Sequence, residues 1–302
     1  MTGKIISVFG STGLQGGAVV NALLKDGTFK VRALTRNVES PSAKKLVEKG
    51  AQVATVDLNN DVESIAKVLQ GSYGVYLVTD FWSLFEKEEE IGKKVVDAAL
   101  KAGVQHFIYS SLANTSKISN GKIVVPEFDM KAHIEDYARQ VSAKHPEFIS
   151  SFVHLPYYAQ GFNTDFLPIT KIEEDKYFIS FPISGKPMEL IDVNDVGPIA
   201  LAEFKDPKKY SGVGIHFTGS ALSGPEIAEK LSKATGKSII FKPMTYEEYL
   251  ALGFPGVEGI ADMFKFVSEY GSYPGKDSNL AKEIIHITTF DEYLEKNPIQ
   301  LK

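Results

Sequence analysis

The first 24 residues constrain the fold of this chain more than any other segment. A short apolar run at residues 5–9 leads directly into a glycine-rich turn at residues 10–16, and an apolar stretch follows at residues 18–24. Strand, glycine turn and helix in this order are typical of a dinucleotide-binding βαβ unit, in which glycines let the backbone approach a pyrophosphate. The free N–H groups at the start of the helix then bind the phosphate oxygens. An ordinary glycine-rich turn is the alternative, and the position between strand and helix favours the dinucleotide site.

Composition and charge narrow the classes of function. The 302 residues include no cysteine, so disulfides, thiolate metal sites and a cysteine nucleophile are excluded, and any redox role must use a bound cofactor. The net charge of −5 argues against nucleic acid as the main ligand, because that partner requires a clustered basic face. We find no signal-peptide pattern and no apolar run near the roughly 18 residues that span a membrane. We therefore expect a cytoplasmic protein without a membrane or nucleic-acid partner.

Strands and helices alternate through the first half of the chain. The pattern predicts strands at residues 5–9, 30–35, 52–56, 74–78, 104–110 and 148–155, and helices at residues 42–49, 61–69, 85–102 and 126–143. Alternation at this spacing requires right-handed crossovers and a parallel sheet. The predicted fold class is therefore α/β, with a doubly wound Rossmann sheet.

The pattern loosens after Pro156. Residues 156–185 are rich in loops and aromatic side chains, and residues 188–193 and 214–218 are predicted to form two further strands. Later helices are predicted at residues 198–204, 224–235, 245–252, 257–270 and 289–296. We expect a Rossmann domain over residues 1–155, with its sheet completed by residues 186–218. Residues 156–185 and 219–302 are expected to form a second, smaller α/β lobe.

The residue that follows the second strand indicates which dinucleotide is bound. NAD-binding units usually place Asp or Glu there, to accept hydrogen bonds from the ribose 2′-hydroxyl. This chain has Arg36 followed by Asn37. A guanidinium grips a 2′-phosphate with paired N–H donors, whereas a carboxylate repels it, so Arg36 predicts NADP(H). Lys44 and Lys45 add positive charge nearby. A solvated surface arginine is the alternative interpretation.

Three other strand ends carry candidate binding residues. Asp57 closes the third strand, where it either hydrogen-bonds an adenine amino group or makes a local turn. Thr79 closes the fourth strand and Ser110 the fifth, and strand ends at a switch point line the ligand crevice. We therefore expect both hydroxyls near the nicotinamide half of the cofactor. Phe81 and Trp82 follow Thr79, either as walls of a nicotinamide pocket or as loop anchors.

Lys131 lies early in the predicted helix at residues 126–143. Short-chain reductases place a tyrosine one helical turn before such a lysine, and the lysine lowers the tyrosine pKa so that the phenol exchanges a proton with a carbonyl. Here Glu127 occupies the tyrosine position, and Tyr-x-x-x-Lys occurs nowhere in the chain. A carboxylate takes over that role only with a large, separately built pKa shift. We predict that Lys131 binds the cofactor ribose, with a surface lysine as the alternative, and the scattered histidines predict no metal site.

These motifs together resemble the NmrA-like family of atypical short-chain dehydrogenase/reductases. The resemblance covers nearly the whole chain, and its most recognisable segments are residues 8–17, 26–32, 34–37, 128–131, 195–197 and 252–256. It implies a Rossmann domain with a small α/β domain and NADP(H) as cofactor. Three positions depart from the family pattern, at Ser40, at Gly92 and within residues 158–161.

The resemblance also implies which residues hold the cofactor. Arg36 would take the 2′-phosphate, Asp57 and Leu58 the adenine side, and Thr79, Phe81 and Lys131 the nicotinamide side. Tyr158 and Gln160 belong to a segment that would close over the cofactor. The pyrophosphate turn would comprise Gly10, Ser11, Thr12, Gly13, Leu14, Gln15 and Gly16.

Two functions remain open at this point, beside a structural module whose dinucleotide pocket is unused. The resemblance implies a regulator that senses NADP(H) and acts through a protein partner, usually without catalysis. The alternative is an NADPH-dependent reductase of quinones or small carbonyls that uses Lys131 without a catalytic tyrosine. The glutamate at position 127 favours the regulator, because it removes the usual acid.

Overall fold

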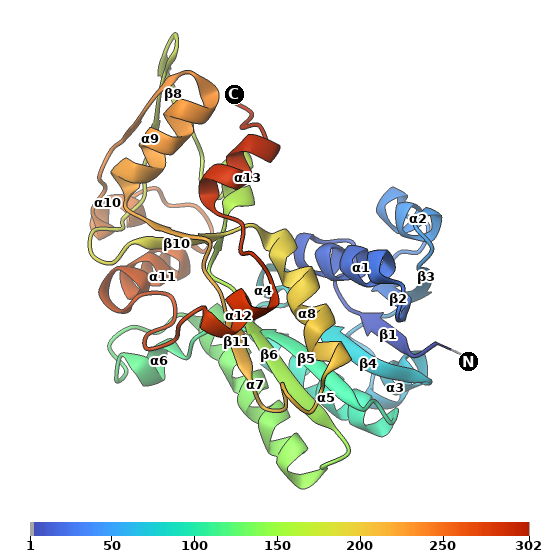
Figure 1. The fold of residues 1–302 in the computed structure, drawn as a ribbon. Helices are drawn as coiled ribbons and strands as arrows, with labels where there is room; N and C mark the ends of the chain where they lie inside the picture. Colours follow the sequence, from blue (N-terminus) through green and yellow to red (C-terminus); the bar gives the residue numbers. More distant parts are fainter. Residues whose placement is uncertain (1–2, 302) are drawn as a thin grey trace.

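A seven-stranded parallel sheet forms the centre of the protein (Figure 1). The computed structural model describes residues 3–301. The sheet order is β11-β6-β5-β4-β1-β2-β3, and every neighbouring pair is parallel. The strands are β1 Ile5–Val8, β2 Lys30–Thr35, β3 Gln52–Thr55, β4 Ser72–Leu77, β5 His106–Ser111, β6 Ile149–His154 and β11 Gly214–His216. The chain winds outward in one direction after β1 and in the other after β4. The crevice beyond the carboxyl ends of β1 and β4 is therefore the switch point, where such folds bind ligands.

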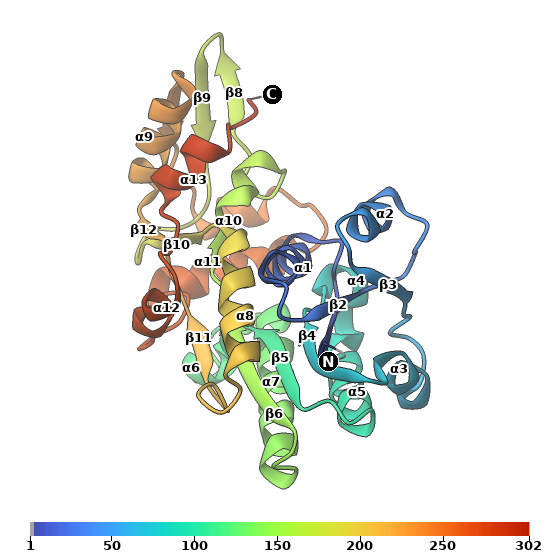
Figure 2. The same ribbon diagram turned by 45° about the vertical axis from the view of Figure 1, so that its right-hand side comes forward.

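Helices cover both faces of this sheet and bury its apolar side chains (Figure 2). One face carries α1 Leu14–Asp26, α2 Pro41–Glu48 and α8 Val196–Lys205, and the other carries α3 Val62–Leu69, α5 Glu88–Lys101 and α7 Pro126–Lys144. Parallel strands are covered on both faces, which explains why every residue of β5 and all but one residue of β4 are buried. The predicted α/β Rossmann class is confirmed.

The helix predicted at residues 85–102 begins three residues later. Phe85 has a φ of 47°, a left-handed conformation that a non-glycine residue rarely adopts and that interrupts the helix. The segment before it divides into α4 Phe81–Leu84 and a 3-10 turn, η1 Phe85–Lys87. The first turn of α5 then carries Glu88 and two further glutamates, which the positive end of the helix dipole stabilises.

A second lobe packs around its own apolar core above the sheet (Figure 1). It contains two small sheets, ordered β12-β10-β7 and β13-β9-β8. Its strands are β7 Tyr157–Tyr158, β8 Thr170–Glu173, β9 Lys176–Ile179, β10 Met188–Ile191, β12 Ser220–Leu222 and β13 Ser238–Phe241. The helices are α9 Gly224–Thr235, α10 Tyr246–Leu250, α11 Val257–Tyr270 and α13 Phe290–Lys296, and the short elements α6 Thr115–Ile118, η2 Ala159–Asn163, η3 Val193–Asp195 and α12 Asn279–Ile284 complete the fold.

One of the two strands expected to complete the central sheet requires correction. β11 joins the edge of β6 as expected, but β10 pairs with β7 in parallel and with β12 in antiparallel. The reason is that the chain leaves the sheet after β6 at Pro156, and β7 lies beyond that exit and offers β10 a new edge. Conversely, α12 was expected to belong to the second lobe, but it packs on α8 and β11 of the Rossmann domain.

Candidate functional site

A cleft of about 1180 Å³ opens at the carboxyl ends of the central strands. The glycine turn forms its floor, the residues that follow β2 and β3 form one end, and the segment after β4 forms the other. Of the predicted cofactor-binding residues, those that line the cleft are Gly10, Thr12, Gly13, Leu14, Gln15, Gly16, Arg36, Asp57, Leu58, Thr79, Phe81 and Tyr158. The fold therefore gathers five distant segments of the sequence around one space.

The glycine turn is shaped by close backbone packing. Gly10 has a φ of 63°, which favours glycine. A Cβ placed on Gly16 would lie 2.2 Å from the carbonyl oxygen of Gly10, so the helix start can approach the strand end only without a side chain. At Gly13, the residue that caps α1, the nearest atom to such a Cβ is the same oxygen at 3.4 Å, an ordinary contact. Ser11 lies beneath the turn, and its hydroxyl donates to the Leu34 carbonyl at 2.8 Å.

Arg36 stands exposed at the rim, directly after β2, and lines the cleft. Within residues 3–301 its guanidinium makes no hydrogen bond or ion pair, which leaves its donors available. Lys44 is less available, because it pairs with Glu39 at 3.1 Å. Ser40, which departs from the family pattern, caps α2 by accepting a hydrogen bond from the Ala43 N–H at 3.2 Å.

Asp57 and Leu58 follow β3 at the same end of the cleft. The Asp57 carboxylate accepts hydrogen bonds at 2.9 Å from both the backbone and the side chain of Asn59. Asp57 therefore makes the contacts of a local turn. Its carboxylate is nevertheless exposed and lines the cleft, where it could also bind an adenine amino group. The two readings of this residue are compatible.

Gln15 lines the cleft and is held between two tyrosines. The buried Tyr76 hydroxyl donates to Gln15 Oε1 at 3.1 Å, and Gln15 Nε2 donates to the Tyr158 hydroxyl. Burial raises the pKa of Tyr158 to about 12, so this phenol stays protonated near neutral pH. Gln160 is not brought to the cleft, because its amide bonds instead to the Asp192 carboxylate at 2.7 Å.

Lys131 reaches toward the end of β4 and is fixed there by three partners. Its Nζ donates to the carbonyl and the hydroxyl of Thr79, each at 2.9 Å, and to the carboxylate of Glu88. Glu88 is fully buried and Lys131 is 12% exposed. Burial lowers the pKa of Lys131, and the charge of Glu88 opposes that shift. The sequence did not reveal the role of Glu88, because nothing in the sequence distinguishes this buried glutamate from the glutamates beside it in the first turn of α5.

A second pocket of about 340 Å³ adjoins the end of the cleft formed by the segment after β4. The two spaces lie side by side, because both are lined by Gln15, Val78, Thr79, Asp80, Phe81 and Tyr158. Further walls of the pocket come from aromatic and apolar side chains on both lobes, among them Trp82, Leu112, Phe128, Tyr157, Phe166, Met263 and Tyr273. Its polar lining includes Lys131 and Glu127.

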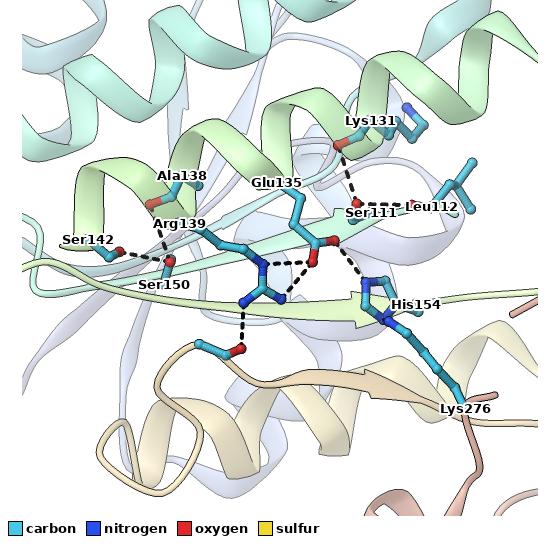
Figure 3. A network of polar contacts seen from close by, with 11 residues as sticks. Ser111, Leu112, Lys131, Glu135, Ala138, Arg139, Ser142, Ser150, His154 and Lys276 are labelled. Carbon is cyan, nitrogen blue, oxygen red and sulfur yellow. Dashed lines mark hydrogen bonds and ion pairs between the residues drawn. The ribbon is translucent and has the colours of Figure 1, made fainter. Parts of the chain in front are cut away.

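A buried polar network behind this pocket holds helix α7 against the sheet (Figure 3). Glu135 accepts hydrogen bonds from Arg139 on the same helix and lies 2.8 Å from the Nε2 atom of His154 on β6. Burial raises the pKa of Glu135, but the contacts with His154, Ser111 and Arg139 outweigh it and lower the pKa to about 2. Ser111 also donates to the Lys131 carbonyl at 3.3 Å, so the helix turn that carries Lys131 is anchored to β5.

Two further features were searched for over residues 3–301. No group of three or more His, Cys, Asp or Glu side chains is arranged to hold a metal ion there. Across the same residues, no helix combines the length and the apolar character that a bilayer crossing requires.

A parallel sheet in this strand order, with a glycine turn at its switch point, defines a Rossmann-type α/β protein. The chain belongs to the NmrA-like family, whose model matches residues 2–294. An NmrA-like family domain-containing protein of Dictyostelium discoideum is 40% identical over 297 residues, covering 97% of each chain. An NmrA-like family domain-containing oxidoreductase of Aspergillus hancockii is 31% identical over 287 residues, covering 89% of this chain and 84% of the other.

Solved structures show the same fold. NmrA, a negative transcriptional regulator crystallised in complex with NADP, matches with a TM-score of 0.78 over 98% of this chain and 95% of its own, at 22% identity. At that identity the likeness concerns the fold.

Proposed function

We propose that this chain binds NADP(H) in the cleft and uses it to reduce a small, flat carbonyl compound in the adjoining pocket. The observation that carries the proposal is that the two spaces adjoin one another, with a shared boundary that includes Gln15, Thr79, Phe81 and Tyr158. A ligand in the pocket would therefore lie directly beside whatever occupies that end of the cleft. Membership in a family with oxidoreductase-named relatives supports the same reading.

The residues of the cleft fit a dinucleotide phosphate. The turn over residues 10–16 gives backbone N–H groups at the start of α1 unobstructed access to a pyrophosphate. Arg36, exposed and unpaired within residues 3–301, offers a fork of donors to a 2′-phosphate at the end where Asp57 and Leu58 would flank an adenine. NADPH, when bound, supplies a hydride from its nicotinamide ring. Thr79 and Phe81 line that end of the cleft and would position the ring, and Lys131 would hold Thr79 in place through its hydrogen bonds.

A specific observation also keeps a regulatory role as a second candidate. No tyrosine precedes Lys131 by one helical turn, so the usual proton donor of short-chain reductases is missing. In that case the chain would sense NADP(H) and act on a protein partner, and the pocket would bind a small effector or the partner itself.

Steady-state NADPH oxidation with a panel of quinones and conjugated aldehydes tests the proposal. The matched variant is Leu112→Trp, because Leu112 lines the pocket and lies outside the cleft. We expect turnover in the unmodified protein, loss of turnover in Leu112→Trp, and equal NADPH affinity in both by calorimetry. Cofactor binding without turnover of any compound, together with NADPH-dependent capture of one reproducible protein, would instead establish the regulator.

A further inference from the structure

Glu127 is the carboxyl group that the pocket presents next to Lys131. It lies in the first turn of α7, one helical turn before Lys131, lines the pocket and is 8% exposed. Its carboxyl accepts a hydrogen bond from its own backbone N–H, and no other side chain within residues 3–301 hydrogen-bonds to it. A Cβ on Gly259 of helix α11 would lie 3.4 Å from Glu127 Oε2, so the glycine leaves this carboxyl close to the helix backbone.

The alternative proton source, Lys131, has no donor to spare. An ammonium group has three N–H donors, and those of Lys131 are used by the Thr79 carbonyl, the Thr79 hydroxyl and Glu88. A substrate that took a proton from Lys131 would have to break one of these buried contacts. Among the residues that line the pocket, Glu127 is a carboxyl without a side-chain partner and is thus free to exchange a proton.

The surroundings of Glu127 favour the protonated form. Burial raises its pKa and outweighs the hydrogen bond from its own backbone N–H, which lowers it. The charges of Glu88 on α5 and Asp262 on α11 raise the pKa further, and Lys131 on the same helix opposes them. Tyr157 on β7 also faces this carboxyl, since the charge of Glu127 raises the pKa of that phenol. A carboxylic acid buried among aromatic side chains is a known solution for acid catalysis near neutral pH.

We propose that Glu127 donates the proton in the reduction of a conjugated aldehyde or ketone bound in this pocket, an inference that rests on the proposed function. The C=O π bond breaks as the carbonyl carbon takes a hydride from NADPH, which is oxidised to NADP⁺, and the oxygen takes the Glu127 proton to give the alcohol. Glu127 is left as a carboxylate and regains a proton from solvent through the open cleft. The aromatic walls select a flat, conjugated substrate, and the carboxyl selects one whose product oxygen is strongly basic.

Cinnamaldehyde and 1,4-naphthoquinone are the two probes that separate this role from a general effect on the site. Reduction of the aldehyde forms an alkoxide, a far stronger base than the hydroquinone anion, so only the aldehyde depends strongly on an acid. In Glu127→Gln we expect kcat with cinnamaldehyde to fall about 10²–10⁴-fold, the usual contribution of acid–base catalysis. With naphthoquinone the fall is expected to be less than about 10-fold, at unchanged NADPH affinity.

The pH dependence of aldehyde turnover is a second test. Aldehyde turnover should fall as pH rises through the pKa of Glu127, because the protonated form is active. Asp262→Asn removes a charge that raises this pKa and should move the fall to lower pH. A rate that rises with pH through the same range would show that the ionised carboxylate acts instead, as in the binding of a cationic substrate, and would overturn the proposal.

A readout independent of turnover is a carbon-13 NMR titration of protein labelled at the glutamate carboxyl carbons. The resonance that disappears in Glu127→Gln should titrate above the ordinary value of 4.5. A Glu127 pKa at or below 4.5 would overturn the role of Glu127 as proton donor, and so would equal losses of kcat with both probes in Glu127→Gln. Neither result would contradict the proposed reductase function. No turnover of either probe by the unmodified protein would instead overturn the reductase itself.

Discussion

The glycine turn offers a matched pair of substitutions that separates cofactor binding from folding. At Gly13 a Cβ meets nothing closer than the Gly10 oxygen at 3.4 Å, and its φ of −90° and ψ of −179° are open to any residue. Gly13→Val should therefore cost no more than about 1 kcal/mol of folding free energy, mainly through a weaker helix cap. At Gly16 a Cβ would lie 2.2 Å from that oxygen and 2.5 Å from its carbon. Backbone must then move, and Gly16→Val should cost about 3 kcal/mol.

The effect of Gly13→Val on NADPH affinity should be large, although its effect on folding is small. Gly13→Val adds a branched side chain at the start of α1, where backbone N–H groups would donate hydrogen bonds to phosphate oxygens. Hydrogen bonds to charged groups contribute about 1.5–3 kcal/mol each, so losing one weakens NADPH binding by about 10- to 100-fold. Urea unfolding measures the first effect and calorimetry the second. Near-normal NADPH affinity in a folded Gly13→Val protein would show that the turn is not the pyrophosphate site.

Two other predictions concern the buried charges that position α7. Glu88→Gln leaves the Lys131 ammonium without its carboxylate and should lower the free energy of unfolding by about 3 kcal/mol, as measured in urea. The double variant Glu88→Gln with Lys131→Met should recover much of that loss, and an additive result would refute the pairing. The pKa of Glu135 is lowered from 4.5 to about 2, so its stabilising contribution is complete above pH 4.5 and is lost as pH falls toward 2. Unfolding in urea from pH 6 to pH 2, compared with Glu135→Gln, should show a smaller acid dependence in the variant.

The sheet could be predicted from local sequence because most of its strands carry their own signal. Parallel strands covered on both faces are apolar runs, and the turn at residues 10–16 has a composition that few other structures require. The position of Arg36 followed from the same reasoning, since it depends only on where β2 ends. The structure confirms the fold class.

Features that depend on distant packing could not be predicted in the same way. The four residues of β8 are all exposed, so no apolar alternation marks that strand. The sequence of β10 predicts a strand. Which strands it pairs with depends on where the chain leaves the central sheet after β6. The role of Glu88 depends on a contact with Lys131, which lies 43 residues away. The environment of Glu127 likewise depends on α11, more than a hundred residues later.

The central claim, that the cleft binds NADP(H) and recognises its 2′-phosphate through Arg36, is tested most directly by calorimetric titration. NADPH and NADH are each titrated into the unmodified protein and into Arg36→Ala. A paired charge-assisted contact is worth about 1.5–3 kcal/mol, so NADPH should bind about 10- to 100-fold more tightly than NADH, and Arg36→Ala should narrow that gap by weakening NADPH alone. Equal affinity for the two cofactors in the unmodified protein, or an unchanged preference in Arg36→Ala, would contradict the account.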